Sequence, residues 1–132
     1  MAARSPRLKA VVSNGGLYHR SFGAAAVFGM PEIMLWTLQH TVGAHSLLGL
    51  GHRLRALSIK RLYGEITIPI LAINGDTDTL VSAQDTVDLA RRAPRGELLL
   101  YPDDDHCAMG HYTEWLDQST QWLERHLRPH DA

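Results

Sequence analysis

The sequence has a single cysteine, Cys107, which excludes a framework of intrachain disulfides and a zinc site built from several cysteines. It also lacks a surplus of charge, because 13 lysines and arginines stand against 14 aspartates and glutamates, for a formal net charge of −1. Such a balance provides no attraction for a nucleic-acid backbone or an acidic membrane, so neither is an expected partner. Glycine and proline, at 11 and 6 of 132 residues, are too few for a collagen-like or low-complexity chain.

Long apolar runs are scarce as well. Residues 33–51 contain no charged side chain and reach membrane-spanning length, but they include three glycines, a glutamine and two histidines, which are costly in hydrocarbon. We therefore expect a buried or pocket-facing helical region there rather than a membrane span. Residues 1–10 carry three basic side chains without a long apolar run, so no export signal is expected and the protein is predicted to be cytoplasmic.

With 45% hydrophobic and 20% charged residues, the composition is that of a globular protein, and 132 residues suffice for one domain. Strand-like and helical segments alternate along the chain. Strands are expected at 8–14, 66–74 and 97–101, and helical segments at 23–62, from 82 towards 94, and at 112–127. Since parallel neighbours need crossover connections, this order predicts an α/β fold with about three parallel strands, flanking helices and a helical insert.

Local signals set several of these bounds. Pro31 suits the start of a helix, and Gly43 suits its C-terminal cap. Pro69 removes a backbone donor, so the ladder of the second strand is expected to begin after it. Ser82, followed three residues later by Asp85, predicts a capping box at the start of the next helix.

Two loops carry the side chains that are best suited to catalysis. Asp76 and Asp78 follow the second predicted strand, and His106 follows the third. The carboxyl ends of parallel strands meet at one edge of a sheet, so a carboxylate and an imidazole from these loops are expected to lie together there. That pair would be the acid and the base of a nucleophilic triad, with Asp78 preferred and Asp76 as the fallback acid. The alternative is that the aspartates only shape turns and cover the surface.

A family resemblance strengthens the triad interpretation. Residues 66–127, which include IPILAINGDTDTLVSAQDTVDLARRAPRGELLLYPDDDHCAMGHYTEWLDQSTQWLERHL, resemble the C-terminal segment of α/β-hydrolase-fold enzymes. The opening PRLKAVVSNGGLYHRSF resembles the strand that follows the nucleophile helix. The Asp-His-Cys loop is most similar to the branch containing fermentation-respiration-switch-type esterases and 2,6-dihydropseudooxynicotine hydrolase. The resemblance implies that Asp78 is the triad acid and His106 the triad base, with no cofactor and no metal.

The sequence departs from that family in one important respect. A nucleophile elbow needs Gly-x-Ser-x-Gly, and the motif does not occur; neither Ser13 nor Ser46 has the required flanking residues. We therefore interpret residues 1–132 as a single C-terminal segment of an α/β-hydrolase domain, whether a truncated reading frame, a fragment or one half of a split enzyme. Its expected partners are an N-terminal half or a second copy, through an open strand edge.

In the resembling family, the segment between the first two of these strands contributes to a cap over the active site, here about residues 23–62. Its apolar side chains would form a pocket for a small apolar or aromatic ester-like substrate. The alternative is ordinary core packing. The residues concerned are Phe22, Phe28, Met30, Ile33, Met34, Leu35, Trp36, Leu38, Leu47, Leu48 and Leu50.

Three other interpretations remain. The chain could be a non-catalytic pseudo-hydrolase or interaction module. The segment 70–80 also resembles the DxDxT signature of haloacid-dehalogenase-type phosphotransferases. Such enzymes need a downstream cation, and both lysines, Lys9 and Lys60, lie upstream, which leaves Arg91, Arg92 and Arg95 as possible substitutes. Eight histidines invite a metal site, yet none of the usual ligand spacings occurs. Cys107 is expected to be a small buried filler rather than a reactive thiol.

Overall fold

Three strands form one parallel sheet in a computed structural model that describes residues 1–23 and 28–128. The strands are β1 (Val11–Asn14), β2 (Ile70–Gly75) and β3 (Gly96–Tyr101), in the order β1-β2-β3. Asn14 pairs with Ile73 of β2, and Gly75 pairs with Tyr101 of β3. The three carboxyl ends therefore lie side by side, and the loops that follow them share one edge of the sheet.

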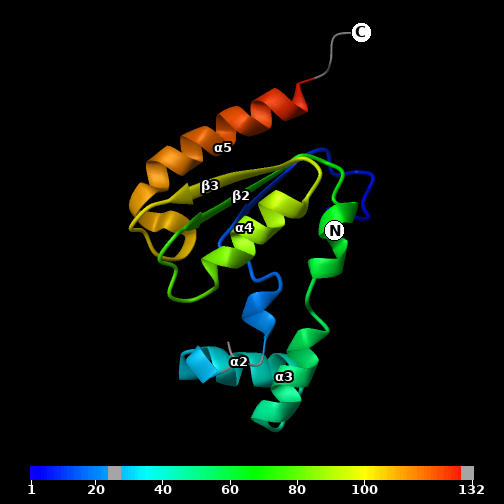
Figure 1. Ribbon diagram of the computed structural model, residues 1–132, viewed down its shortest axis with the longest axis vertical. Coiled ribbons are helices and arrows are strands. Elements are labelled where there is room, and N and C mark those ends of the chain that lie inside the picture. The colour runs from blue at the N-terminus through cyan, green and yellow to red at the C-terminus, as the bar shows by residue number, and fades with distance from the viewer. Residues whose placement is uncertain (24–27, 129–132) are drawn as a thin grey trace.

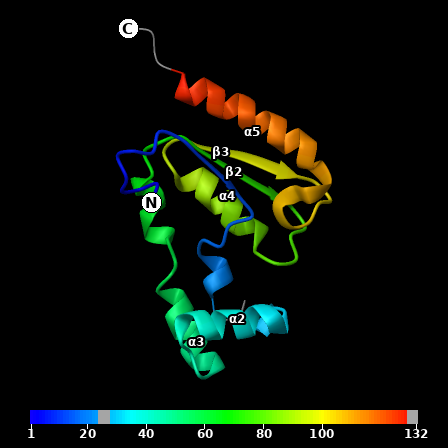
Figure 2. The same cartoon turned by 180° about the vertical axis from the view of Figure 1, so that it is seen from behind.

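The helices form a layer on each face of the sheet and a separate lobe. Figures 1 and 2 show one helix, α4, on one face, another, α5, on the opposite face, and α2 and α3 crossing each other at the end of the molecule opposite α5. The helices are α2 (Glu32–Val42), α3 (Leu47–Arg55), α4 (Ala83–Arg92) and α5 (Tyr112–Leu127), with short 3₁₀ turns η1 (Arg20–Phe22), η2 (Lys60–Glu65) and η3 (His106–His111). The predicted order of strands and helices is confirmed.

The centre of the core is β2, in which every residue is buried. Its side chains alternate between the faces: Ile70 and Ala72 pack in the cluster that contains Leu89 of α4, and Leu71 and Ile73 pack in the cluster that contains Trp122 of α5. Burying a side chain such as isoleucine or leucine contributes about 1.5–3 kcal/mol. A central parallel strand covered on both faces therefore reads as an unbroken apolar run, as residues 70–73 do.

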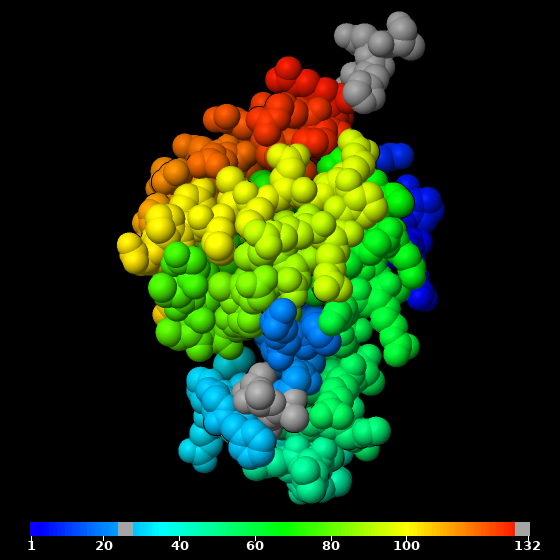
Figure 3. All heavy atoms as spheres, viewed as in Figure 1, coloured from blue at the N-terminus to red at the C-terminus, as the bar shows by residue number. Residues whose placement is uncertain are grey.

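The helical insert has a small core of its own. Phe22, Ala44, Leu50 and Leu54 are buried together, with Leu17, Leu35, Leu38 and Val42 packed against them. Figure 3 shows the atoms of α2 and α3 gathered at one end of the molecule. Gly43 ends α2 in the left-handed conformation, with φ of 66°, which confirms the predicted cap. Residues 24–27 of the predicted insert lie outside the described residues.

The capping-box prediction is wrong. Ser82 does precede α4, but its side chain makes no capping hydrogen bond. The carboxylate of Asp85 instead accepts hydrogen bonds from the backbone N–H groups of His19, Arg20 and Ser21, at 2.9, 2.7 and 3.2 Å. A buried carboxylate needs several donors, and the start of a 3₁₀ turn, where backbone N–H groups have no partner within the turn, offers more of them than Ser82 does. Asp85 therefore fastens the start of the insert to α4.

The expectation of a helical region rather than a membrane span at 33–51 agrees with two helices separated by Gly43. None of the helices within residues 1–23 and 28–128 has both the length and the apolar character that a bilayer crossing requires.

Both outer strands, β1 and β3, have an open edge within the described residues, and the edge at β1 is the one that the sequence predicts to pair. The N–H groups of Val11 and Gly15 donate to Pro69 and Ile73, on the β2 side. Backbone groups alternate along a strand, so those of Val12 and Asn14 point to the open edge, where no strand pairs with them in the described structure.

We predict that the purified chain self-associates through this edge, with a mass that rises with concentration in size-exclusion chromatography with light scattering.

Two proline variants separate edge pairing from general instability. Val12→Pro removes an edge-facing N–H and should reduce association while leaving the β1–β2 ladder in place. Ser13→Pro removes an inward-facing N–H and should instead lower the urea midpoint of unfolding. A chain that stays monomeric at every concentration would contradict the prediction.

Candidate active site

The structure brings together the two residues that the sequence singles out. Nδ1 of His106, at the start of η3, lies 2.9 Å from Oδ2 of Asp78, in the loop after β2. The Asp78 side chain has no exposed surface, whereas 32% of the His106 side chain is exposed. An ionised carboxylate only accepts hydrogen bonds, so the shared proton sits on Nδ1. Nε2 makes no hydrogen bond within the described residues.

The Asp78 carboxylate is held by several donors. Oδ1 accepts from the backbone N–H groups of Leu80 and Val81, at 2.8 and 2.9 Å, and Oδ2 also accepts from Nδ2 of Asn74 at 2.7 Å. Burial alone would raise the pKa of Asp78. The hydrogen bonds from Val81, His106, Asn74 and Leu80 together outweigh burial, so the pKa lies below its ordinary value. The carboxylate is therefore ionised and fixed in position.

The loop that carries His106 is braced by its acidic residues. Asp105 accepts from the N–H of His106 at 2.8 Å and from the N–H of Thr79 at 2.7 Å, which joins the two site loops. Asp104 lies 2.7 Å from Nδ1 of His111, at the far end of η3. The acidic run Asp103–Asp105 is thus more than solvated surface, because two of its carboxylates organise the loop.

Cys107 and Ala108, directly after His106, adopt left-handed backbone conformations, with φ of 62° and 50°. Such conformations cost on the order of 1–2 kcal/mol for a residue with a side chain, so the surroundings must enforce them. Nδ2 of Asn14 donates to the carbonyl of Cys107, and Oδ1 of Asn74 accepts from its N–H, each at 3.0 Å. Sequence reasoning missed both asparagines, because an asparagine before a glycine at a strand end is typical of an ordinary turn.

Gly15 completes the packing around the histidine loop. It has a φ of 58°, and a Cβ at this position would lie 2.4 Å from Sγ of Cys107 and 2.9 Å from Cε1 of His106. A larger residue would therefore displace the imidazole. Burial and the nearby Asp78 carboxylate raise the pKa of the Cys107 thiol, which opposes thiolate chemistry there.

A cavity of about 240 Å³ adjoins Asp78. It lies between the Asp78 loop and the entrance to the insert, and it combines polar and apolar walls. Its lining residues are Arg20, Ser21, Gly29, Met30 and residues 78–82. Of the apolar insert residues predicted to line a pocket, Met30 reaches this cavity, whereas Phe22 and Leu50 are core of the insert. The core-packing alternative therefore accounts for part of that set.

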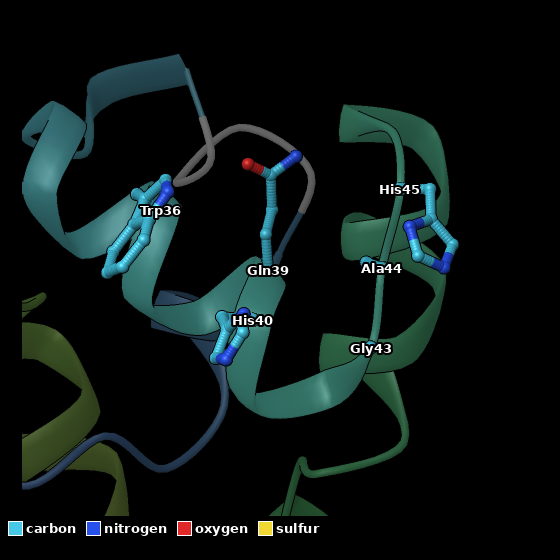
Figure 4. Close-up of a pocket in the computed structure, with 6 residues that line it drawn as sticks. All are labelled: Trp36, Gln39, His40, Gly43, Ala44 and His45. Carbon is cyan, nitrogen blue, oxygen red and sulfur yellow. The ribbon is translucent and has the colours of Figure 1, made fainter.

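A second cavity, of about 430 Å³, lies on the insert and contains neither Asp78 nor His106. Figure 4 shows its side chains rising from α2 and from the segment before α3. Trp36 and His40 stack with ring centroids 5.7 Å apart, one helical turn from each other. Both side chains are exposed, and the remaining lining residues are Gln39, Gly43, Ala44 and His45.

The fallback acid and the DxDxT interpretation both depend on Asp76. Asp76 is exposed, and its Oδ1 accepts from the N–H of Asp103 at 2.8 Å, away from His106. Asp76 and Asp78 thus bond different partners. Across the described residues, no three histidine, cysteine or carboxylate side chains are grouped to hold a metal ion.

Solved structures match this chain, whereas no protein-family model and no curated protein sequence does. The 2,6-dihydroxy-pseudo-oxynicotine hydrolase matches 96% of the chain with a TM-score of 0.80 at 20% identity, and the match covers 35% of that protein. AbyA5 matches 93% with a TM-score of 0.78 at 19% identity, over 37% of its length. The esterase PF2001 of Pyrococcus furiosus matches 96% with a TM-score of 0.67 at 15% identity, over 48% of its length.

These matches confirm the predicted fold: a three-stranded parallel sheet with flanking helices, which is part of the α/β-hydrolase fold. The chain spans between about a third and a half of the length of these structures.

The lowered pKa of Asp78 predicts an acid-dependent loss of stability. Because the folded state favours the ionised carboxylate, the unfolded state binds more protons once the pH falls below about 4, and stability declines there. At neutral pH, Asp78→Asn should be less stable than wild type by about 1–3 kcal/mol, since bonds to a charged acceptor are lost. The difference in free energy of unfolding between wild type and Asp78→Asn should narrow as the pH falls, as measured by urea unfolding at a series of pH values.

Asp117→Asn is the matched control, because Asp117 is exposed on α5. It should lie close to wild type throughout. A gap between Asp78→Asn and wild type that stays constant down to low pH would contradict the assigned role of the ionised carboxylate.

Proposed function

We propose that this chain supplies the acid and the base of a serine-hydrolase catalytic triad, with Asp78 as the acid and His106 as the base. The proposal rests on the 2.9 Å contact between Nδ1 of His106 and Oδ2 of Asp78, with Nε2 free of hydrogen bonds to the described residues. In addition, the α/β-hydrolase-like sheet ends its strands at the edge from which both loops leave.

The proposed chemistry follows from the free Nε2. His106 accepts the proton of a serine hydroxyl as the serine oxygen forms a bond to the substrate carbonyl. The ionised Asp78 stabilises the resulting imidazolium and holds its orientation. Nε2 then returns the proton to the leaving group as the bond to the carbonyl carbon breaks, and a water molecule repeats the cycle to release the acyl group. The bond cleaved is an ester, an amide or an activated C–C bond.

The serine nucleophile is proposed to come from a segment outside these 132 residues. No Gly-x-Ser-x-Gly occurs in them, and the two serines considered from the sequence have other partners. The hydroxyl of Ser13 lies 2.5 Å from that of Tyr18, and the hydroxyl of Ser46 caps α3 by accepting from the N–H of Gly49. The hydroxyl groups of both serines therefore bond groups other than His106.

The open edge of β1 is the proposed docking place for that segment. The backbone groups of Val12 and Asn14 point to this edge, and Oδ1 of Asn14 is buried without a hydrogen-bond partner among the described residues. Buried acceptors are rarely left unpaired in a complete structure. A strand added beside β1 would pair the edge and bring donors to this oxygen.

The proposed substrate is a small apolar or aromatic ester-like molecule, bound under residues 23–62 as a cap. The cavity beside Asp78 supports this assignment, because Met30, Leu80 and Val81 offer it apolar surface. The polar residues Arg20 and Ser21 also line this cavity and would orient the carbonyl end of a bound substrate. Of the three matched structures named above, one is described as a hydrolase and one as an esterase.

The test uses the chain alone and then together with the nucleophile segment. Alone, it should hydrolyse p-nitrophenyl esters no faster than its His106→Ala variant, and a fluorophosphonate probe should label no serine. Joined to the Gly-x-Ser-x-Gly segment encoded upstream in the same frame, it should gain activity and label at that serine. His106→Ala should then abolish turnover, and Asp78→Asn should lower kcat by about 10⁴-fold.

Two outcomes would overturn the proposal. Labelling of Ser13 or Ser46 with activity in the chain alone would mean that the nucleophile lies within it. An upstream sequence without the motif, in a chain that binds another strand through β1, would favour a non-catalytic interaction module.

A further inference from the structure

The chain contains two asparagines, Asn14 and Asn74, and both bond the backbone of Cys107, the residue after the proposed catalytic base. Asn14 is the last residue of β1 and Asn74 is the last but one of the adjacent parallel strand β2, and Asn14 pairs with Ile73, the neighbour of Asn74. One asparagine donates to the Cys107 carbonyl, and the other accepts from the Cys107 N–H. Both hydrogen-bonding groups of a single peptide residue are thus taken up by side chains from the sheet.

These two hydrogen bonds act on a strained part of the backbone. Cys107 and Ala108 are both left-handed, and the direction of the His106 side chain depends on where its backbone is held. A loop bonded only to itself would relax towards a right-handed turn, and the imidazole would move with it. Asn14 and Asn74 offer the hydrogen bonds that make the strained conformation the favoured one.

Asn74 also reaches the acid. Its Nδ2 donates to Oδ2 of Asp78 at 2.7 Å, and this is the same oxygen that faces Nδ1 of His106. The side chain has no exposed surface and contacts Thr86 of α4 at 3.5 Å. A single rigid amide therefore links the carboxylate of the acid to the peptide that follows the base, so the separation of the two loops is fixed through it.

We propose that Asn14 and Asn74 form a clamp on Cys107 that positions His106 against Asp78, and that they are positioning residues for the hydrolysis inferred above. The inference rests on that proposed function for its catalytic meaning. Its structural content concerns the His106 ring, which can be observed in this chain whether or not a substrate is turned over.

The first readout is the His106 ring itself, followed by ¹⁵N and ¹H NMR of the chain labelled at histidine. In wild type, a slowly exchanging Nδ1 proton should be seen, with Nε2 unprotonated. In Asn14→Ala and in Asn74→Ala, that proton should exchange rapidly with water, and the ring nitrogens should average between the two tautomers. Gln84→Ala is the matched control, because it removes an exposed side-chain amide bonded to Asp88 and should keep the wild-type ring signals.

The second readout is catalysis in the chain joined to its nucleophile segment. Displacing a catalytic group by about 1 Å can cost about 10²-fold in rate, so each clamp variant should lower kcat by that factor. KM should change little, because neither asparagine lines the cavity beside Asp78. If the joined protein has no activity at all, the proposed function fails, while the ring signals still decide whether the clamp exists.

Variants that retain the wild-type ring signals would overturn the clamp. If the alanine variants do not fold, Asn14→Asp keeps the volume but removes the donor to Cys107 and should show the same loss of the Nδ1 proton. Hydrogen exchange in wild type provides a test without substitution. The clamp requires the Cys107 amide to be protected, and exchange at the rate of an open loop would contradict it.

Discussion

The site depends on the pairing of β2 with both of its neighbours. β2 is parallel to β1 and to β3, and its pairs bring Asn14, Gly75 and Tyr101 to one edge of the sheet. A shift of one residue would exchange the side chains that β2 packs on the α4 side with those that it packs on the α5 side, so the packing on both faces holds the register. The same packing that gives the fold its core thereby sets the distance between the Asp78 and His106 loops.

Polar side chains also position the site, because they form hydrogen bonds between segments that are far apart in sequence. Asp85 fastens the entrance of the insert to α4, while Asp105 joins the two site loops through Thr79. Asn14 and Asn74 close the network at Cys107. Each of these side chains bonds at least one backbone donor or acceptor of a loop, so the removal of any one leaves at least one such group unpaired. The precision of the site lies in this network rather than in the sheet alone.

The fold and the contact between Asp78 and His106 were predictable from the sequence, because both leave local patterns in it. β2 reads as a buried strand, Gly43 marks the end of a helix, and Asp78 and His106 each follow a strand at a spacing shared with a known fold. The clamp and the role of Asp85 were not predictable in this way. They depend on contacts across 93 residues for Asn14 and 66 for Asp85 with His19. A local pattern suggested a capping box for Asp85, and the tertiary contact prevailed over it.

The central claim is that His106, oriented by Asp78, is the base for a serine supplied by another segment. The most direct measurement is a crystal structure of the chain joined to that segment. Our account predicts the new strand beside β1 and the serine Oγ about 2.6–3.2 Å from Nε2 of His106, with the Asp78 contact retained. A structure in which Nε2 faces away from the serine, or in which Asp78 bonds another group instead of His106, would contradict it.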